Sequence, residues 1–248
     1  MVALHEPVLS GGGDRLPMAA GKVLIIQNDA TENLGLYEKL LREKAQIDVV
    51  HAYSGEAFPG TEKYSHFIVG PTPISANEVQ RHTFLVKEWE YLSRIIGSGK
   101  PTLGVCCGGQ ILARLLGGEV VKSPRKEVGG YTVTLTDAGV TEPLFRGFLQ
   151  SIPVFHWHSD MFKIPPGGKL LARGNPCPIQ AYAWRNVRGV IFHLEIDHNE
   201  AERWASAYPD ELEAVGKTKA QVLDECTAAE GEMRRLAGLL VDNFLALA

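Results

Sequence analysis

The sequence lacks the features that mark several large classes of protein. No run of apolar residues reaches the roughly 18 that a membrane-spanning helix needs, so no membrane segment is predicted. Lysine and arginine total 25 against 29 aspartate and glutamate residues, a net charge of -4, which excludes a general nucleic-acid binder. Four cysteines in 248 residues are too few and too unevenly placed for a disulfide framework. A reducing compartment is therefore favoured, and we predict a cytoplasmic protein.

Residues 1–20 show no sustained hydrophobic periodicity and contain several glycines and prolines. Their apolar stretches are interrupted by His5, Glu6 and Pro7, which is not the pattern of a secretory signal peptide. We predict a flexible leader over residues 1–20 and a single domain over residues 21–248.

From residue 22 onward, short apolar runs alternate with segments of helical periodicity. The runs typical of buried strands are residues 22–26, 47–50, 66–69 and 101–105, and the helical patterns are residues 34–41, 84–96 and 110–116. Such alternation predicts an α/β fold with a mostly parallel central sheet and helices on both faces.

The second half of the chain has a different pattern. Short strand candidates separated by proline and glycine occur at residues 120–121, 131–135, 154–157, 170–171 and 180–184. They are typical of antiparallel hairpins, so we expect a small antiparallel sheet appended to the parallel one. Residues 188–193 return to a core-strand pattern, and the last fifty residues are helical.

Residues 104–110, Gly-Val-Cys-Cys-Gly-Gly-Gln, carry the clearest chemical signal. A strand that turns sharply into a helix presents one side chain at the carboxyl edge of a sheet, and small neighbours let the turn close. A cysteine at a helix N-terminus is favoured as the thiolate, and the free amides there can stabilise an oxyanion. The alternative is that Cys106 and Cys107 are simply small buried residues.

His193 and Glu195 are two residues apart at a predicted strand end, so their side chains face the same way. Glu195 can then accept a hydrogen bond from one ring nitrogen while the other nitrogen faces a thiol. Cysteine, histidine and carboxylate in these roles make a catalytic triad. The alternative is a pair of exposed polar residues at a strand end.

The chain resembles the class I glutamine amidotransferases in three separated motifs. Residues 104–110 fit the pattern G-x-C-x-G-x-Q, residues 192–195 (Phe-His-Leu-Glu) resemble F-H-P-E, and residues 67–71 (Phe-Ile-Val-Gly-Pro) resemble the oxyanion strand. Residues 118–120, 127–129 and 156–160 also match stretches of the family. The resemblance implies a flavodoxin-like three-layer fold and, among free-standing members, the subgroup similar to GMP-synthetase glutaminases and γ-glutamyl peptidases.

The resemblance also implies roles for individual residues. Cys106 would attack the side-chain amide of glutamine or of a γ-glutamyl group, with His193 as base and Glu195 as its orienting carboxylate. The backbone amides of Gly70 and Cys107 would hold the oxyanion.

Five further residues align with segments that hold the amino-acid end of the substrate: Thr72, Gln110, His158, Ser159 and Asp160. Asp160 would pair with the substrate ammonium group. No metal and no cofactor is expected; the alternative is that His156 and His158 are metal ligands together with Asp160, although no further ligand spacing supports it.

Three positions depart from the family pattern. Leu194 replaces the usual proline between the triad residues, which leaves the alternation of side chains intact. Gly70 stands where many members have two glycines, so the oxyanion loop could depend on a partner or on substrate to become ordered. Cys107 is a free thiol that could intercept oxidised Cys106.

Three functions remain open at this point. The first is a glutaminase that releases ammonia, for use by a separate synthase, because no ATP-binding motif is present in the sequence. The second is a peptidase that cleaves γ-glutamyl peptides. The third is a non-catalytic binding or regulatory module. The sequence does not specify an oligomeric state or the ammonia acceptor.

Overall fold

The computed structural model describes residues 21–248, so the expected leader over residues 1–20 lies outside the described residues. The strands are β1 (Val23–Gln27), β2 (Ile47–His51), β3 (His66–Val69), β4 (Thr102–Val105), β5 (Val120–Leu135), β6 (Ser151–Phe162), β7 (Lys169–Arg173), β8 (Ala181–Trp184) and β9 (Val187–Val190). The α-helices are α1 (Gly35–Lys44), α2 (Thr83–Gly97), α3 (Cys107–Leu115), α4 (Asp137–Val140), α5 (His198–Ala207), α6 (Pro209–Val215) and α7 (Lys219–Leu245). Short 3₁₀ turns cover Ala52–Ser54, Thr61–Lys63, Ala76–Arg81 and Pro143–Phe145.

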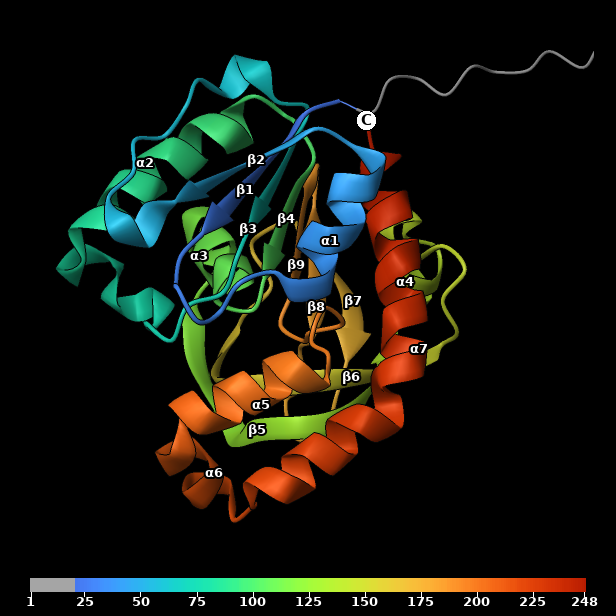
Figure 1. Cartoon of the computed structure of the whole chain (residues 1–248). Coiled ribbons are helices and arrows are strands. Elements are labelled where there is room, and N and C mark those ends of the chain that lie inside the picture. The colour runs from blue at the N-terminus through green and yellow to red at the C-terminus, as the bar shows by residue number, and fades with distance from the viewer. Residues whose placement is uncertain (1–20) are drawn as a thin grey trace, which may run out of the picture.

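Within residues 21–248 the strands form one sheet in the order β2-β1-β3-β4-β9-β8-β7-β5-β6. The pairings from β2 to β9 are parallel, and the pairings from β9 to β6 are antiparallel. The α/β class predicted from the sequence is therefore confirmed. The expected predominance of parallel strands was wrong, because the antiparallel part has as many strand pairings as the parallel part. The antiparallel part is also continuous with the parallel part rather than a separate small sheet (Figure 1).

The antiparallel part was underestimated because prolines divide two long strands in the sequence. Pro124 falls where the β5–β6 register shifts between Lys122 and Glu127, and Pro153 lies on β6, the last strand of the sheet. Proline is tolerated at both kinds of place, a bulge and a sheet edge. The separate candidates at residues 120–121 and 131–135 therefore belong to the single strand β5.

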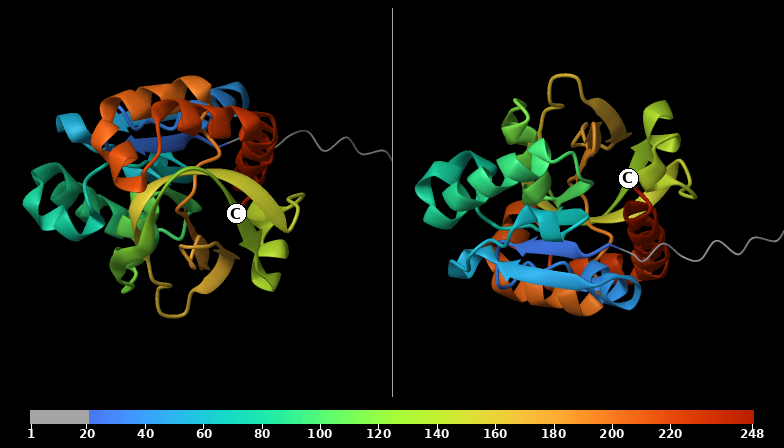
Figure 2. Two further views of the ribbon diagram at one scale, coloured as in Figure 1. Left: turned by 90° about the horizontal axis from the view of Figure 1, so that it is seen from below. Right: turned by 90° about the horizontal axis from the view of Figure 1, so that it is seen from above.

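The two faces of the sheet bury two hydrophobic cores. Along β1, Val23 and Ile25 pack into one core, and Leu24 and Ile26 into the other. The first core is covered by α1, α5 and α7 and the second by α2 and α3, which gives three layers (Figures 1 and 2). This alternation follows from the two-residue repeat of a strand, and it explains why β1 is apolar throughout.

The helices match their sequence patterns with small shifts at the ends. The predicted 34–41 and 84–96 segments become α1 and α2, while the helix predicted over 110–116 begins earlier, at Cys107. In the last fifty residues, α7 begins with a capping box between Thr218 and Gln221. None of the helices within residues 21–248 combines the length and the apolar character that a membrane crossing requires.

Candidate active site

Cys106 lies at a strained turn between β4 and α3. Its φ of 51° and ψ of -114° put a non-glycine residue in the left-handed half of the backbone map, which costs about 1–3 kcal/mol. Its N–H donates to the Val190 carbonyl at 2.8 Å, which joins the turn to the end of β9. A Cβ atom on Gly104 would lie 2.6 Å from the backbone of Gly109, so only glycine lets α3 pack this closely on β4. The turn presents Cys106 at the carboxyl edge of the parallel strands, as the motif predicts.

The Cys106 thiol is almost completely buried, with 6% of the residue exposed. Burial, followed by the negative charge of Glu32, raises the pKa of Cys106 well above its ordinary value. The sequence suggested that the helix N-terminus would favour a thiolate; in this structure burial outweighs that effect. The thiol is therefore protonated in the free protein and lies 3.9 Å from the Trp157 carbonyl oxygen.

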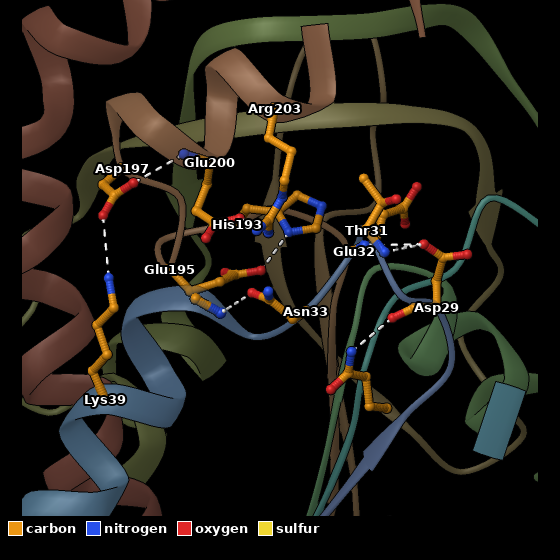
Figure 3. A network of polar contacts seen from close by, with 12 residues as sticks. Asp29, Thr31, Glu32, Asn33, Lys39, His193, Glu195, Asp197, Glu200 and Arg203 are labelled. Carbon is orange, nitrogen blue, oxygen red and sulfur yellow. Dashed lines mark hydrogen bonds and ion pairs between the residues drawn. The ribbon is translucent and has the colours of Figure 1, made fainter. Parts of the chain in front are cut away.

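His193 and Glu195 form a buried hydrogen-bonded pair in the turn that follows β9. Nδ1 of His193 lies 2.6 Å from Oε1 of Glu195, and both side chains are inaccessible to solvent (Figure 3). The other carboxylate oxygen accepts from the Leu194 N–H at 3.0 Å, a contact that a proline at this position could not make. Because the carboxylate accepts at Nδ1, the ring leaves Nε2 as its unprotonated nitrogen.

The structure does not join the thiol and the imidazole directly. No hydrogen bond connects Cys106 to His193 within residues 21–248, and Nε2 of His193 is buried without a partner there. His193 is anchored through its backbone, which pairs with Phe155 in an isolated antiparallel bridge, and its ring packs edge-on against Trp204 at 5.0 Å. Within residues 21–248, Nε2 is thus free of competing hydrogen bonds, and the thiol contacts the Trp157 carbonyl instead.

The Gly70 amide is already used by the sheet. Its N–H donates to the Ile26 carbonyl at 2.9 Å, while its carbonyl accepts from the Asn28 side chain at 3.3 Å. Asn28 also donates to the fully buried carboxyl of Glu88 at 3.0 Å, and burial raises the pKa of Glu88 to about 8. The Cys107 N–H, by contrast, is at the first position of α3, where no intrahelical acceptor exists.

One pocket contains the thiol and all the residues expected to hold the substrate. Its lining includes Thr72, Cys106, Cys107, Gln110, His158, Ser159 and Asp160. Gly70, His193 and Glu195 do not line it. Inside the pocket, the Gln110 side chain donates to the backbone carbonyl of Asp160 at 3.2 Å, which ties α3 to β6.

The same pocket has acidic and aromatic residues that the sequence reading did not single out: Glu32, Trp157, Tyr208 and Glu211. Trp157 donates from its ring nitrogen to Glu211 at 2.5 Å. Glu32 follows β1, and the carboxyl ends of parallel strands are where ligands bind in such sheets, so its position gave a usable signal. Tyr208 and Glu211 lie at the junction of α5 and α6, which only the tertiary structure brings to the site.

His156 and His158 meet Glu127, and not the Asp160 carboxylate, in a buried cluster. The donor atoms of these three residues lie within 4.8 Å of one another, and within residues 21–248 they are the group that could hold a metal ion. Nε2 of His158 is 2.9 Å from Glu127, and its Nδ1 is 3.0 Å from the Asp160 carbonyl oxygen. Within the described part of the chain both nitrogens of His156 lack a hydrogen-bond partner, and burial lowers the pKa of this ring well below its ordinary value. The alternative that Asp160 joins His156 and His158 as a metal ligand was therefore wrong, because Glu127 is the carboxylate beside the two histidines.

All four cysteines are buried free thiols. The Cys107 sulfur points to the Ile74 carbonyl at 3.1 Å, whereas Cys106 points to Trp157. The neighbouring thiols therefore face different backbone carbonyls.

Comparisons with known proteins agree with this architecture. The model of the class I glutamine amidotransferase family matches residues 24–205. The chain therefore belongs to the class I glutamine amidotransferase family, as its motifs predict. It is 30% identical over 203 residues to the glutamine amidotransferase-like protein YfeJ of Salmonella typhimurium, covering 79% of this chain and 85% of that protein. It is 29% identical over 170 residues to a glutamine-hydrolysing GMP synthase subunit of Sulfurisphaera tokodaii, covering 67% and 80%.

A crystal structure of a glutamine amidotransferase from Thermotoga maritima is also similar. It superposes with a TM-score of 0.85 at 28% identity and covers 92% of this chain and 99% of that one. A glutamine amidotransferase from Methylobacillus flagellatus gives a TM-score of 0.82 at 26% identity, covering 90% and 93%.

Proposed function

We propose that this protein hydrolyses the side-chain amide of glutamine through a γ-glutamyl thioester on Cys106. The observation that carries the proposal is the placement of Cys106 at a left-handed strand-to-helix turn inside the pocket, in a chain of this family. The buried His193–Glu195 pair supplies a candidate base whose Nε2 has no other hydrogen-bond partner within residues 21–248.

In the first step the thiol of Cys106 turns from Trp157 towards His193. Nε2 of His193 takes the thiol proton while sulfur forms a bond to the amide carbon. The carbonyl electron pair moves to oxygen, and the Cys107 N–H, at the positive end of α3, donates to the oxyanion. Gly70 can add a second donor only if its N–H leaves the Ile26 carbonyl, so this half of the expected oxyanion hole requires a local rearrangement.

In the second step the carbon–nitrogen bond breaks and His193 returns its proton to nitrogen, which releases ammonia. Water then attacks the thioester as His193 takes one of its protons. The carbon–sulfur bond breaks, the thiolate is reprotonated, and glutamate leaves. Throughout, Glu195 holds the proton on Nδ1 and stabilises the imidazolium form.

Relatives of this chain include glutamine-hydrolysing subunits of GMP synthase. We propose on that basis that a separate synthase protein takes up the ammonia. A γ-glutamyl peptide presents the same scissile carbonyl, and its cleavage would follow the same steps with an amine as the leaving group.

The test measures ammonia release from glutamine and amine release from a γ-glutamyl dipeptide, with wild-type protein and Cys106→Ala. We expect turnover of at least one substrate by the wild type and none above background by Cys106→Ala. Undiminished turnover by Cys106→Ala overturns the mechanism.

Covalent labelling provides a second readout that does not depend on a partner. A glutamine-like diazo-ketone should add to Cys106, as read by mass spectrometry of the digested protein. Cys107→Ala is the matched control and should be labelled like the wild type. An adduct on Cys107 with Cys106 unmodified would contradict the assignment.

A further inference from the structure

Glu32 is a buried carboxyl in the pocket that has no cation beside it. The residue is 6% exposed, lines the same pocket as Cys106, and forms no ion pair with a lysine, arginine or histidine of residues 21–248. Its side-chain hydrogen-bond partner is Tyr208, which is neutral. Burying a carboxylate without a counter-charge costs free energy, so such a residue in a ligand pocket needs an explanation.

The other two acidic residues of the pocket are already neutralised. Asp160 has one oxygen 2.7 Å from the Lys122 ammonium and accepts from Ser75 at 2.7 Å on the other. Glu211 lies 2.9 Å from the Lys126 ammonium and accepts from Trp157. Within residues 21–248, Glu32 is therefore the pocket carboxyl that has no cation beside it.

The loop that carries Glu32 is rigidly built. The carboxylate of Asp29 accepts from the N–H groups of Thr31 and Glu32 at 2.7 and 3.0 Å, which forms a tight turn directly after β1 (Figure 3). Farther on, Gly35 has a φ of +41°, and a Cβ atom there would lie 2.6 Å from the Glu195 carbonyl oxygen. The loop is thus fixed against the segment that holds Glu195, and Glu32 is held at a defined place in the pocket.

We propose that the Glu32 carboxylate is the receptor for a primary ammonium group of the substrate, in place of Asp160. The proposal rests on the proposed function. The ammonium can come from two sources: the α-ammonium of the γ-glutamyl group or an ammonium carried by the departing amine. Both offer the same charge and donors to a carboxylate, so substrates that contain only one of them distinguish the two.

The charges around Glu32 give this contact a second consequence. Asp29 and Glu211 are acidic neighbours, and Tyr208 is its hydrogen-bond partner. Once ionised, Glu32 is the neighbour whose charge most raises the pKa of the Cys106 thiol. Burial, with Asp29 and Glu211 adding to it, raises the pKa of Glu32 to about 8. Glu32 is therefore largely protonated at neutral pH in the free protein. A substrate ammonium would make it ionise, with release of a proton, and would balance the new negative charge near the thiol.

The test compares kcat/KM of the wild type and Glu32→Gln on two matched pairs of substrates. The first pair is glutamine and glutaramate, which lacks the α-ammonium. The second is the mono-γ-glutamyl amide of 1,4-diaminobutane and the γ-glutamyl amide of butylamine. In one pair, Glu32→Gln should lower kcat/KM of the ammonium-bearing member by about 10- to 100-fold more than that of its partner, because a hydrogen bond to a charged group is lost. The affected pair identifies the source of the ammonium.

Two matched variants complete the design. Glu211→Gln removes a pocket carboxyl that already has a cation, and it should leave the ratio within each pair unchanged. Asp160→Asn should likewise leave the ratios unchanged. A ratio that responds to Asp160→Asn and not to Glu32→Gln would overturn the proposal while leaving the thioester mechanism intact.

A binding measurement tests the proposal even if the protein turns over its substrate only when a partner protein is present. Titration calorimetry on Cys106→Ala and on Cys106→Ala/Glu32→Gln measures the affinity of the same four compounds in two buffers of different ionisation enthalpy. We expect a proton release that only the ammonium-bearing compound shows and that the double variant loses. Equal affinities for both variants would overturn the assignment of Glu32. Loss of labelling and turnover at Cys106 would instead contradict the proposed function.

Discussion

Residues 21–248 contain two buried histidine–glutamate pairs, and the pairs differ in the hydrogen bonds that the ring nitrogens make. His193 and Glu195 meet at 2.6 Å in the turn after β9, and His158 and Glu127 meet at 2.9 Å between β6 and β5. Both carboxylates have about 1% exposure or less, and so have both rings. Burial and residue type are therefore the same, and the hydrogen bonds at the second ring nitrogen make the difference.

The second nitrogen of His158 is occupied, whereas that of His193 is free. Nδ1 of His158 lies 3.0 Å from the Asp160 carbonyl oxygen, which only accepts, so this nitrogen carries a proton. Nε2 lies 2.9 Å from the Glu127 carboxylate, without the geometry of a hydrogen bond. Within residues 21–248 the His193 ring has a single hydrogen bond, to Glu195, so its Nε2 can accept a proton. One pair is suited to acid–base catalysis and the other to holding β5 and β6 together.

Removing His193, the proposed base, should reduce activity more than any other change considered below. His193→Asn should reduce kcat by roughly 10³- to 10⁴-fold, because general-base assistance and the orientation of the base are lost together. The rate of Cys106 alkylation by a diazo-ketone should also fall, while the melting temperature reports that the protein is folded. A kcat within tenfold of wild type would show that His193 is not the base.

A change of Glu195, the carboxylate proposed to orient His193, should have the next largest effect on activity. Glu195→Gln can donate where Glu195 accepts, so it favours the wrong tautomer of His193 and should lower kcat by roughly 10²- to 10⁴-fold. KM should change little, because Glu195 does not line the pocket. Glu127→Gln is the matched variant in the other pair. If it lowers kcat as much as Glu195→Gln does, the two pairs do not differ in catalytic role as proposed.

Variants of the second pair should affect stability more than chemistry. His158→Asn removes the ring that faces the buried Glu127 carboxyl, and the loss of a partner for a buried polar group costs about 1–3 kcal/mol. Denaturant unfolding should show this loss. Because His158 lines the pocket, KM for glutamine should rise, while kcat of the folded protein should fall by less than about tenfold. Glu127→Gln tests the same contact from the other side. A double-mutant cycle of the two should show strong coupling, and additive effects would show that His158 and Glu127 do not stabilise each other.

The sequence predicted the nucleophile turn and the parallel half of the sheet well, because their signals are local. Residues 104–110 determine the geometry of this turn by themselves, because Gly104 and Gly109 are needed where α3 packs on β4. It predicted the pairing of His193 with Glu195, although these residues lie in a turn beyond β9 and not on a strand.

The features that the sequence did not predict depend on contacts between distant segments. Glu127 approaches His158 only because β5 and β6 pair across a shifted register. The occupied amide of Gly70 and the neutralised charge of Asp160 depend on Ile26 and Lys122, which no motif connects to them. The raised pKa of Cys106 likewise reflects burial, which a helix N-terminus does not reveal.

Glu88 is another buried carboxyl, and its hydrogen-bond partner within residues 21–248 is Asn28 rather than a histidine. Burial raises its pKa to about 8, from 4.5 in an unfolded chain. Between these values the folded state keeps the proton that the unfolded state releases. The free energy of unfolding therefore falls as pH rises from about 4.5 to 8, by up to about 1.4 kcal/mol per pH unit for one group.

Glu88→Gln keeps an acceptor for Asn28 and removes this titration. We expect the variant to be less sensitive to pH between 5 and 8 and more stable than the wild type at pH 8, as measured by urea unfolding. Glu32→Gln should remove a second contribution of the same sign, because its pKa is also raised to about 8. A variant whose stability still falls as steeply as that of the wild type would mean that Glu88 is ionised in the folded protein. The Asn28–Gly70 contact would then depend on a charged carboxylate rather than a neutral acid.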